Sequence, residues 1–120
     1  MANKREFKKY VSAVGASMCE DIMICYYNIP DIDHKAANEA VGKILGAMNE
    51  ATKRSNVFFD KGKRAFESDE AYSKAKKAFF RAVFAKIAGD FRKDLEEAVK
   101  QFNAAIPQAV KEKNKEIANA

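Results

Sequence analysis

Hydrophobic residues recur every three or four positions along most of this chain, and three long segments carry the pattern. In the first segment, an unbroken stripe starts at Phe7 and Val11 and continues to Ile29. This spacing places the apolar side chains on one face of an α-helix. The pattern therefore predicts an all-α fold, a bundle of three long helices at about residues 3–29, 33–54 and 69–106.

Helix-start and helix-stop residues support these bounds. Asn3 is the expected N-cap of the first helix, and either Asp31 or Asp33 is suited to cap the second. Such side chains accept a hydrogen bond from a backbone N–H of the first turn. The third helix is expected to begin near Ser68 and to end or kink at Pro107, because proline does not fit a helix interior.

Glycines within the predicted helices raise two structural questions. Gly42 and Gly46 in the second helix favour a close approach to a neighbouring helix, because small residues leave room for one. Gly89 lies inside the third helix, where Gly89-Asp90 is also suited to end one helix and cap a fourth. The apolar stripe keeps its phase across Gly89, which favours one continuous or kinked helix.

The composition is typical of a folded helical domain. Of the 120 residues, 48% are hydrophobic and 32% are charged, which is too apolar for a disordered chain. A chain of this length can bury a core without disulfides or metal ions. We expect one helical-bundle domain over residues 1–120, in which residues 108–120 form a frayed polar tail.

The longest apolar run does not resemble a signal peptide or a membrane span. It covers residues 12–29 and is interrupted by Glu20 and Asp21. Cys19 and Cys25 are six residues apart on one helix, about 9 Å along its axis, and point in different directions. They cannot form a disulfide with each other. We expect a cytoplasmic protein that does not insert into a membrane.

No set of residues predicts catalysis, a metal centre or a cofactor. His34 is the only histidine, and it follows Asp31 and Asp33 at a helix start, where consecutive positions do not converge on one ion. Glu20-Asp21 is interpreted as a surface or interface pair rather than a buried acid catalyst. Gly62-Lys63 lacks the other residues of a phosphate-binding loop. We expect no enzymatic activity and no cofactor.

The region 61–93 is basic and follows a segment rich in phenylalanine. Residues 61–90 hold eight lysines and arginines against four acids. Aromatic rings beside cations can stack bases and hold phosphates, whereas the alternative is that the rings plug the end of the bundle and the cations stay in solvent. The candidate polyanion-binding residues are Phe58, Phe59, Lys61, Lys63, Arg64, Lys74, Lys77 and Arg81.

The first helix is apolar on a second side as well, along Ala13, Ala16, Ile24 and Tyr27. A helix of this kind is covered on more than one side, which favours self-association, most simply as a two-fold dimer. The leading hypothesis is a non-enzymatic protein–protein interaction or self-association module, and the alternative is nucleic-acid or polyanion binding through residues 61–93. The candidate interface residues are Ile24, Tyr27, Phe84, Phe91 and Phe102.

The first nine residues carry one resemblance. They read Met1-Ala2-Asn3-Lys4-Arg5-Glu6-Phe7-Lys8-Lys9 and resemble the start of a group of small uncharacterised proteins from gut bacteria. That group is similar to this chain in length and helical pattern. No activity is established for the group, so the resemblance implies a bacterial, cytoplasmic setting and no functional site.

Overall fold

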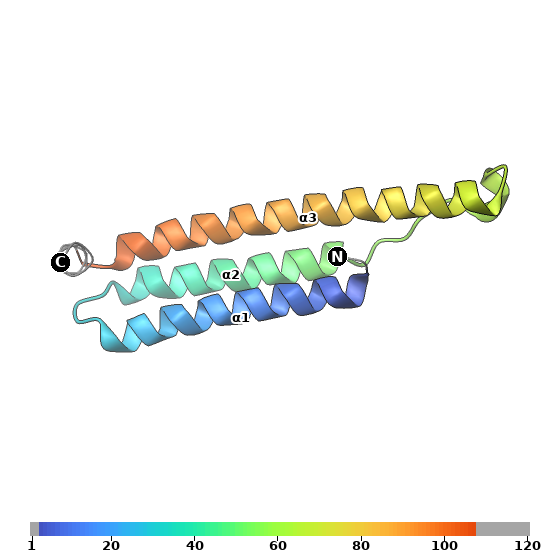
Figure 1. The fold of residues 1–120 in the computed structure, drawn as a ribbon. Helices are drawn as coiled ribbons and strands as arrows, with labels where there is room; N and C mark the ends of the chain where they lie inside the picture. The colour runs from blue at the N-terminus through green and yellow to red at the C-terminus, as the bar shows by residue number, and fades with distance from the viewer. Residues whose placement is uncertain (1–2, 108–120) are drawn as a thin grey trace, which may run out of the picture.

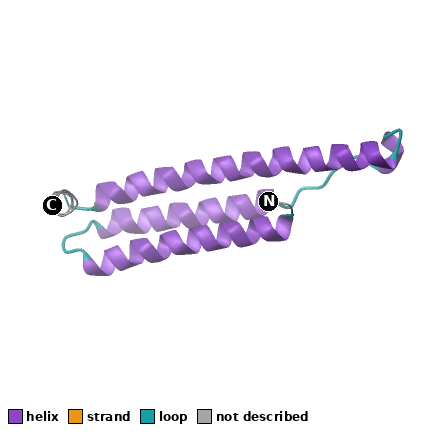
Figure 2. Ribbon diagram, viewed as in Figure 1, coloured by secondary structure: helices purple, strands orange, loops and turns teal. Residues whose placement is uncertain are grey.

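Three long α-helices form an up-down-up bundle in the structure, a computed structural model that describes residues 3–107 (Figure 1). Helix α1 spans Lys4–Asn28, α2 spans His34–Arg54 and α3 spans Asp69–Ala105. A short 3-10 turn, η1, lies at Lys63–Ala65, and loops make the other connections (Figure 2). The predicted three-helix, all-α fold is confirmed, and each helix end lies within one residue of the predicted position. The expected tail at residues 108–120 lies outside the described residues.

A side-chain cap fixes the start of each helix. The cap oxygen accepts a hydrogen bond from the backbone N–H three residues later, at 2.8 Å for Asn3, 3.1 Å for Asp33 and 3.1 Å for Ser68. Each cap stabilises its helix by about 1 kcal/mol. Asp31, the other candidate for α2, lies in the turn before the helix with a φ of 59°, a left-handed conformation that aspartate adopts more readily than most residues.

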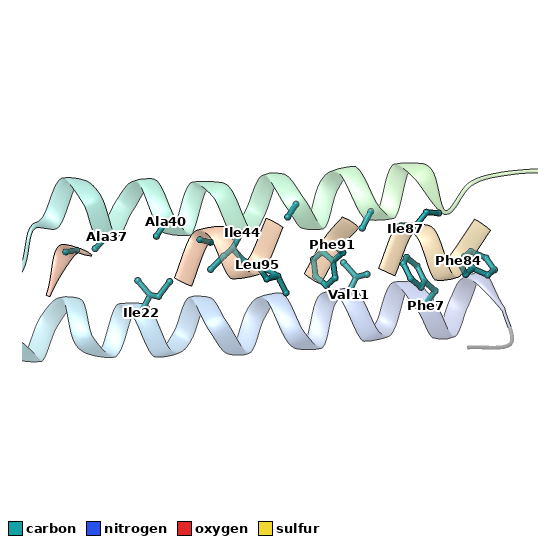
Figure 3. Packing of buried hydrophobic residues seen from close by; sticks show 14 of the residues in the cluster. Phe7, Val11, Ile22, Ala37, Ala40, Ile44, Phe84, Ile87, Phe91 and Leu95 are labelled. Carbon is teal, nitrogen blue, oxygen red and sulfur yellow. The ribbon is translucent and has the colours of Figure 1, made fainter. Parts of the chain in front are cut away.

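The hydrophobic core lies along the line where the three helices meet, and the helices contribute residues of different sizes (Figure 3). Helices α1 and α3 supply most of the large side chains, whereas four of the five buried residues of α2 are alanines. Short alanine side chains let the α2 backbone approach its neighbours closely. The main core residues are Phe7, Val11, Ile22, Ala37, Ala40, Ile44, Ala47, Ala51, Phe84, Ile87, Phe91 and Leu95.

Glycine permits a close helix approach in α1, not in α2. Gly15 is buried, and a Cβ atom placed on it would collide with the side chain of Met48 on α2. Gly42 and Gly46 are exposed, and a Cβ atom on either would have no neighbour within 4 Å. The prediction that Gly42 and Gly46 mark a close approach is therefore wrong, because both lie on the solvent side of α2.

Replacing Gly42 or Gly46 with alanine is expected to stabilise the protein. The new methyl group meets no atom, and alanine loses less backbone entropy than glycine when a helix forms. Each substitution should raise the free energy of unfolding by about 0.5–1 kcal/mol, measured by urea denaturation followed by circular dichroism. A lower urea midpoint in both variants would contradict the exposed placement of these residues.

Polar side chains hold α2 and α3 in register. The Arg54 guanidinium donates a hydrogen bond of 2.8 Å to the Asp90 carboxylate, and Lys43 lies 3.6 Å from Glu97. The hydrogen bond from Arg54 lowers the pKa of Asp90 below its ordinary value. At the other end of the bundle, the backbone N–H of Asp33 donates to the carbonyl of Ala105 at 3.0 Å. The turn between α1 and α2 is thereby tied to the end of α3.

Helix α3 is continuous through Gly89, as its apolar stripe predicted, and it is much longer than its partners. It has 37 residues against 25 in α1 and 21 in α2. The first turns of α3 therefore extend past the end of the bundle (Figure 1), and the molecule measures 65 × 30 × 17 Å. Residues 69–83, which precede the first buried core residue of α3, Phe84, are called the arm here.

Candidate functional site

The most exposed large apolar side chains of α1 lie on the side opposite the core. Ile24 is 61% exposed and Tyr27 is 76% exposed. They continue a row of exposed residues at steps of three and four, which places them on one helix face. This row, called the outer face of α1, consists of Lys9, Ala13, Ala16, Glu20, Ile24 and Tyr27.

The outer face of α1 has a defined order of charge and size. It is basic at Lys9, small and apolar at Ala13 and Ala16, and acidic at Glu20. Beside its second half lies a shallow surface groove of about 600 Å³, whose lining includes Met23 and the exposed face residues from Ala16 onward. In the described part of the chain, no other helix packs on this face.

Three of the five predicted interface residues lie in or against the hydrophobic core rather than on an exposed face. Phe91 is 2% exposed, Phe84 is nearly as deeply buried, and Phe102 is half-buried against the core. Phe84 stacks on Phe7 with ring centroids 5.3 Å apart, and Phe91 meets Tyr10 edge to face at 6.3 Å. The expectation that Phe84 and Phe91 face a partner is therefore wrong, because both rings are buried and pack against α1 within one chain.

The phenylalanines between α2 and α3 divide into two groups. Phe59 packs on Phe66, Tyr72 and Phe79, with ring centroids 5.3–6.0 Å apart. The loop thus folds back onto the arm and covers one side of it, rather than plugging the end of the bundle. Phe58 does not join this cluster: it is 80% exposed, and the Lys4 ammonium lies 4.6 Å from its ring centroid.

The candidate basic residues of the loop and of the arm do not share one face. The loop packs on the side of the arm that carries Tyr72 and Phe79. Helical geometry places Lys74, Lys77 and Arg81 on the opposite side, because each is offset from the Tyr72–Phe79 line by more than 100°. The structure therefore separates the three candidate cations of the loop from the three candidate cations of the arm, and it places all six in solvent.

A second basic segment, outside the residues predicted from the sequence to bind a polyanion, lies beside the loop. The start of α1, residues 4–9, holds four lysines and arginines against one acid. The Lys8 ammonium donates a hydrogen bond of 2.8 Å to the side chain of Asn56, which lies 48 positions later in the chain. The sequence shows the high charge density of residues 4–9. That Asn56 and Phe58 lie close to this segment depends on the tertiary fold.

The arrangement of titratable side chains offers little reactive chemistry. His34 is exposed, and its ring contacts Tyr26 in a tilted arrangement, with 4.3 Å between the ring centroids. Burial raises the pKa of the Cys19 thiol, which disfavours the reactive thiolate. Within residues 3–107, no group of three or more histidine, cysteine, aspartate or glutamate side chains is close enough to hold a metal ion.

Comparisons with known proteins add no assignment. No family model, no curated protein and no solved structure matches the chain significantly. Among the described helices, none has an apolar stretch long enough to cross a membrane. The function must therefore be inferred from the surfaces of the chain itself.

Proposed function

We propose that this protein is a non-enzymatic self-association module in which the outer face of α1 pairs with the same face of a second copy. The exposure of Ile24 and Tyr27 on that face is the observation that supports this proposal most strongly. Tyrosine is enriched in the buried centres of protein interfaces. A helix face of this composition gains stability when a partner removes it from water.

Charge order along the face favours an antiparallel pair. When Ala13 lies opposite Ala16 of the second copy, Lys9 lies opposite Glu20 of the second copy, and the two-fold axis repeats this pair. The alanines at the centre let the two helices approach closely. Parallel pairing would instead place Lys9 on Lys9 and Glu20 on Glu20, and like charges in contact oppose association.

The expected dimer is weak and depends on concentration. One helix pair provides an area at or below the low end of specific interfaces, about 1,200 Å². Interfaces of that size tend to be transient, so we expect a dissociation constant on the order of micromolar. The proposed setting is the cytoplasm, which suits the free thiols of Cys19 and Cys25.

Glutamate substitutions on the outer face of α1 test this proposal. Ile24→Glu and Tyr27→Glu should each weaken the dimer at least about tenfold, because association then covers less apolar surface and must remove a carboxylate from water. Sedimentation velocity over a concentration series measures the shift between the 13.4 kDa chain and a dimer of about 27 kDa, twice that mass. Both side chains are exposed, so the helical circular dichroism signal should persist.

A matched control comes from α2. Leu45 is 50% exposed and lies on another helix, so Leu45→Glu should leave the dissociation constant unchanged. A parent protein that stays monomeric at high concentration would contradict the proposal. Equal weakening by Leu45→Glu and Ile24→Glu would assign the contact to a different surface.

Polyanion binding at the other end of the molecule is a second candidate, which we favour less. It is supported by Phe58, an exposed ring with Lys4 above it, in the loop that also carries the cations of residues 61–64. Exposed aromatic rings with nearby cations bind single-stranded nucleic acid by base stacking and charge. The affinity for a single-stranded oligonucleotide should then fall steeply with salt and should be lost in Lys63→Glu/Arg64→Glu. Retained binding in that double variant would exclude this site.

A further inference from the structure

A groove with an aromatic floor opens beside the start of α1, where the arm of α3 continues past the bundle. Its volume is about 800 Å³, within the usual range of roughly 300–1,000 Å³ for ligand sites. Ala85 and Ala88 form part of one wall, where their short side chains leave the space open. The floor is formed by Phe7, Phe80 and Phe84, and the mouth by Ser73, Lys76, Lys77 and Arg81.

The floor of the groove is a fixed stack of rings. Phe84 stacks on Phe7 at 5.3 Å and on Phe80 at 5.9 Å between centroids, with interplanar angles of 22° and 23°. Phe7 and Phe84 are buried in the core, which holds their orientation. Phe80 is half-buried, so part of the stack is open to solvent. A groove lined by apolar rings of this kind suits a hydrocarbon chain.

The cations at the mouth have no acidic neighbour along the helix. The residues three and four positions from Lys76, Lys77 and Arg81 include no aspartate or glutamate. Within residues 3–107, these three side chains take part in no salt bridge, whereas Arg54 and Lys43 do. Lys77 and Arg81 are four residues apart, so they lie side by side and repel each other. A bound anion would relieve that repulsion.

We propose that this groove binds a free long-chain carboxylate, an anionic amphiphile of the fatty-acid class. Lys77 and Arg81 hold the carboxylate at the mouth, and the hydrocarbon chain lies along Phe80 and Phe84. A polyanion without an apolar part would leave the exposed part of Phe80 in water. An uncharged lipid would leave the like charges of Lys77 and Arg81 without a counterion.

Isothermal titration calorimetry on the full chain separates these ligand classes. Laurate, kept below its micelle concentration, should bind with a stoichiometry of one per chain. Dodecanol lacks the charge and inorganic sulfate lacks the tail, so each should bind at least about tenfold more weakly than laurate. Equal affinity for laurate and dodecanol would overturn the proposal, because the cations would then contribute nothing.

Charge-neutralising variants locate the site. Lys77→Gln/Arg81→Gln should weaken laurate binding at least about tenfold, whereas Lys61→Gln/Lys63→Gln, the same loss of charge in the loop, should leave it within about twofold. All four side chains are exposed, and an unchanged helical circular dichroism signal confirms that each variant folds. If both double variants weaken laurate binding equally, the effect depends only on the net charge of the protein. That result would overturn the proposal.

A vesicle-binding experiment distinguishes a free ligand from a membrane surface. Sedimentation of the protein with phosphatidylglycerol vesicles is expected to leave it in the supernatant. If the protein binds these vesicles and does not bind monomeric laurate, the ligand is a lipid headgroup in a membrane. That result would overturn the proposal of a free carboxylate. The groove lies on α1 and α3 away from the outer face of α1, so these results do not depend on whether the dimer forms.

Discussion

Replacing Phe91 with alanine is expected to lower the free energy of unfolding by about 3–5 kcal/mol. Phe91 is among the largest fully buried side chains, and its ring lies between α1 and α2 (Figure 3). Truncation removes a buried ring and leaves a cavity next to Tyr10 and Val11. Small proteins are stable by only about 5–15 kcal/mol, so this single change should remove a large part of the total.

Urea denaturation followed by circular dichroism measures this loss. Leu45→Ala is the control, since Leu45 is half-exposed on α2 and its truncation leaves no cavity. That substitution should lower the free energy of unfolding by less than about 1 kcal/mol. Equal losses in the two variants would contradict the central position of Phe91. A charged substitution at Phe91 would unfold the chain, so it cannot test an interface.

Replacing Gly15 with leucine is also expected to lower the free energy of unfolding, through overpacking rather than through a cavity. The new side chain must occupy the space that Met48 fills, so either the Met48 side chain or the spacing of α1 and α2 has to change. Overpacking of this kind costs about 1–3 kcal/mol, even though leucine favours helix more than glycine does. At Gly46 a Cβ atom has no neighbour within 4 Å, so the same substitution should raise the free energy of unfolding by up to about 1 kcal/mol.

A second substitution should rescue part of the Gly15 effect. Met48→Ala removes the side chain that the new leucine meets, so the two changes together should cost less than the sum of the single changes. The coupling in a double-mutant cycle should reach about 1 kcal/mol or more, in the favourable direction. Simple additivity of the two losses would show that Gly15 and Met48 do not limit the approach of α1 to α2.

Helix number and helix ends could be predicted because their causes are local. The side chain that caps each helix lies three residues before the N–H that it accepts from, as Asn3 and Asp33 show. The phase of an apolar stripe is also local, and it correctly predicted that α3 continues through Gly89. Ser68 caps α3 by the same local geometry.

The division of apolar residues between core and surface could not be predicted in this way. A stripe shows which residues share a face, but not which neighbour covers that face. Phe91 and Ile24 both belong to strongly apolar stripes, yet one ring is fully buried and the other side chain is 61% exposed. The glycines show the same limit: Gly15, within a stripe of larger residues, permits the close approach that the sequence suggested for Gly42.

The surroundings of the loop and the arm depend on distances that the sequence does not contain. Helix lengths alone indicated that α3 extends beyond its partners. Which side of the arm the loop covers is set by the packing of Phe59 against Tyr72 and Phe79. That packing leaves the opposite side of the arm, with Lys77 and Arg81, for the groove.

A charge swap on the outer face of α1 tests the proposed self-association most directly. Lys9→Glu and Glu20→Lys should each weaken the dimer about tenfold or more, because each creates two like-charge contacts across the two-fold axis. The double variant restores both pairs with reversed sign. Sedimentation equilibrium should therefore return its dissociation constant to within about threefold of the parent. A double variant as weak as the single variants, or a parent without any dimer, would contradict the antiparallel pairing of α1.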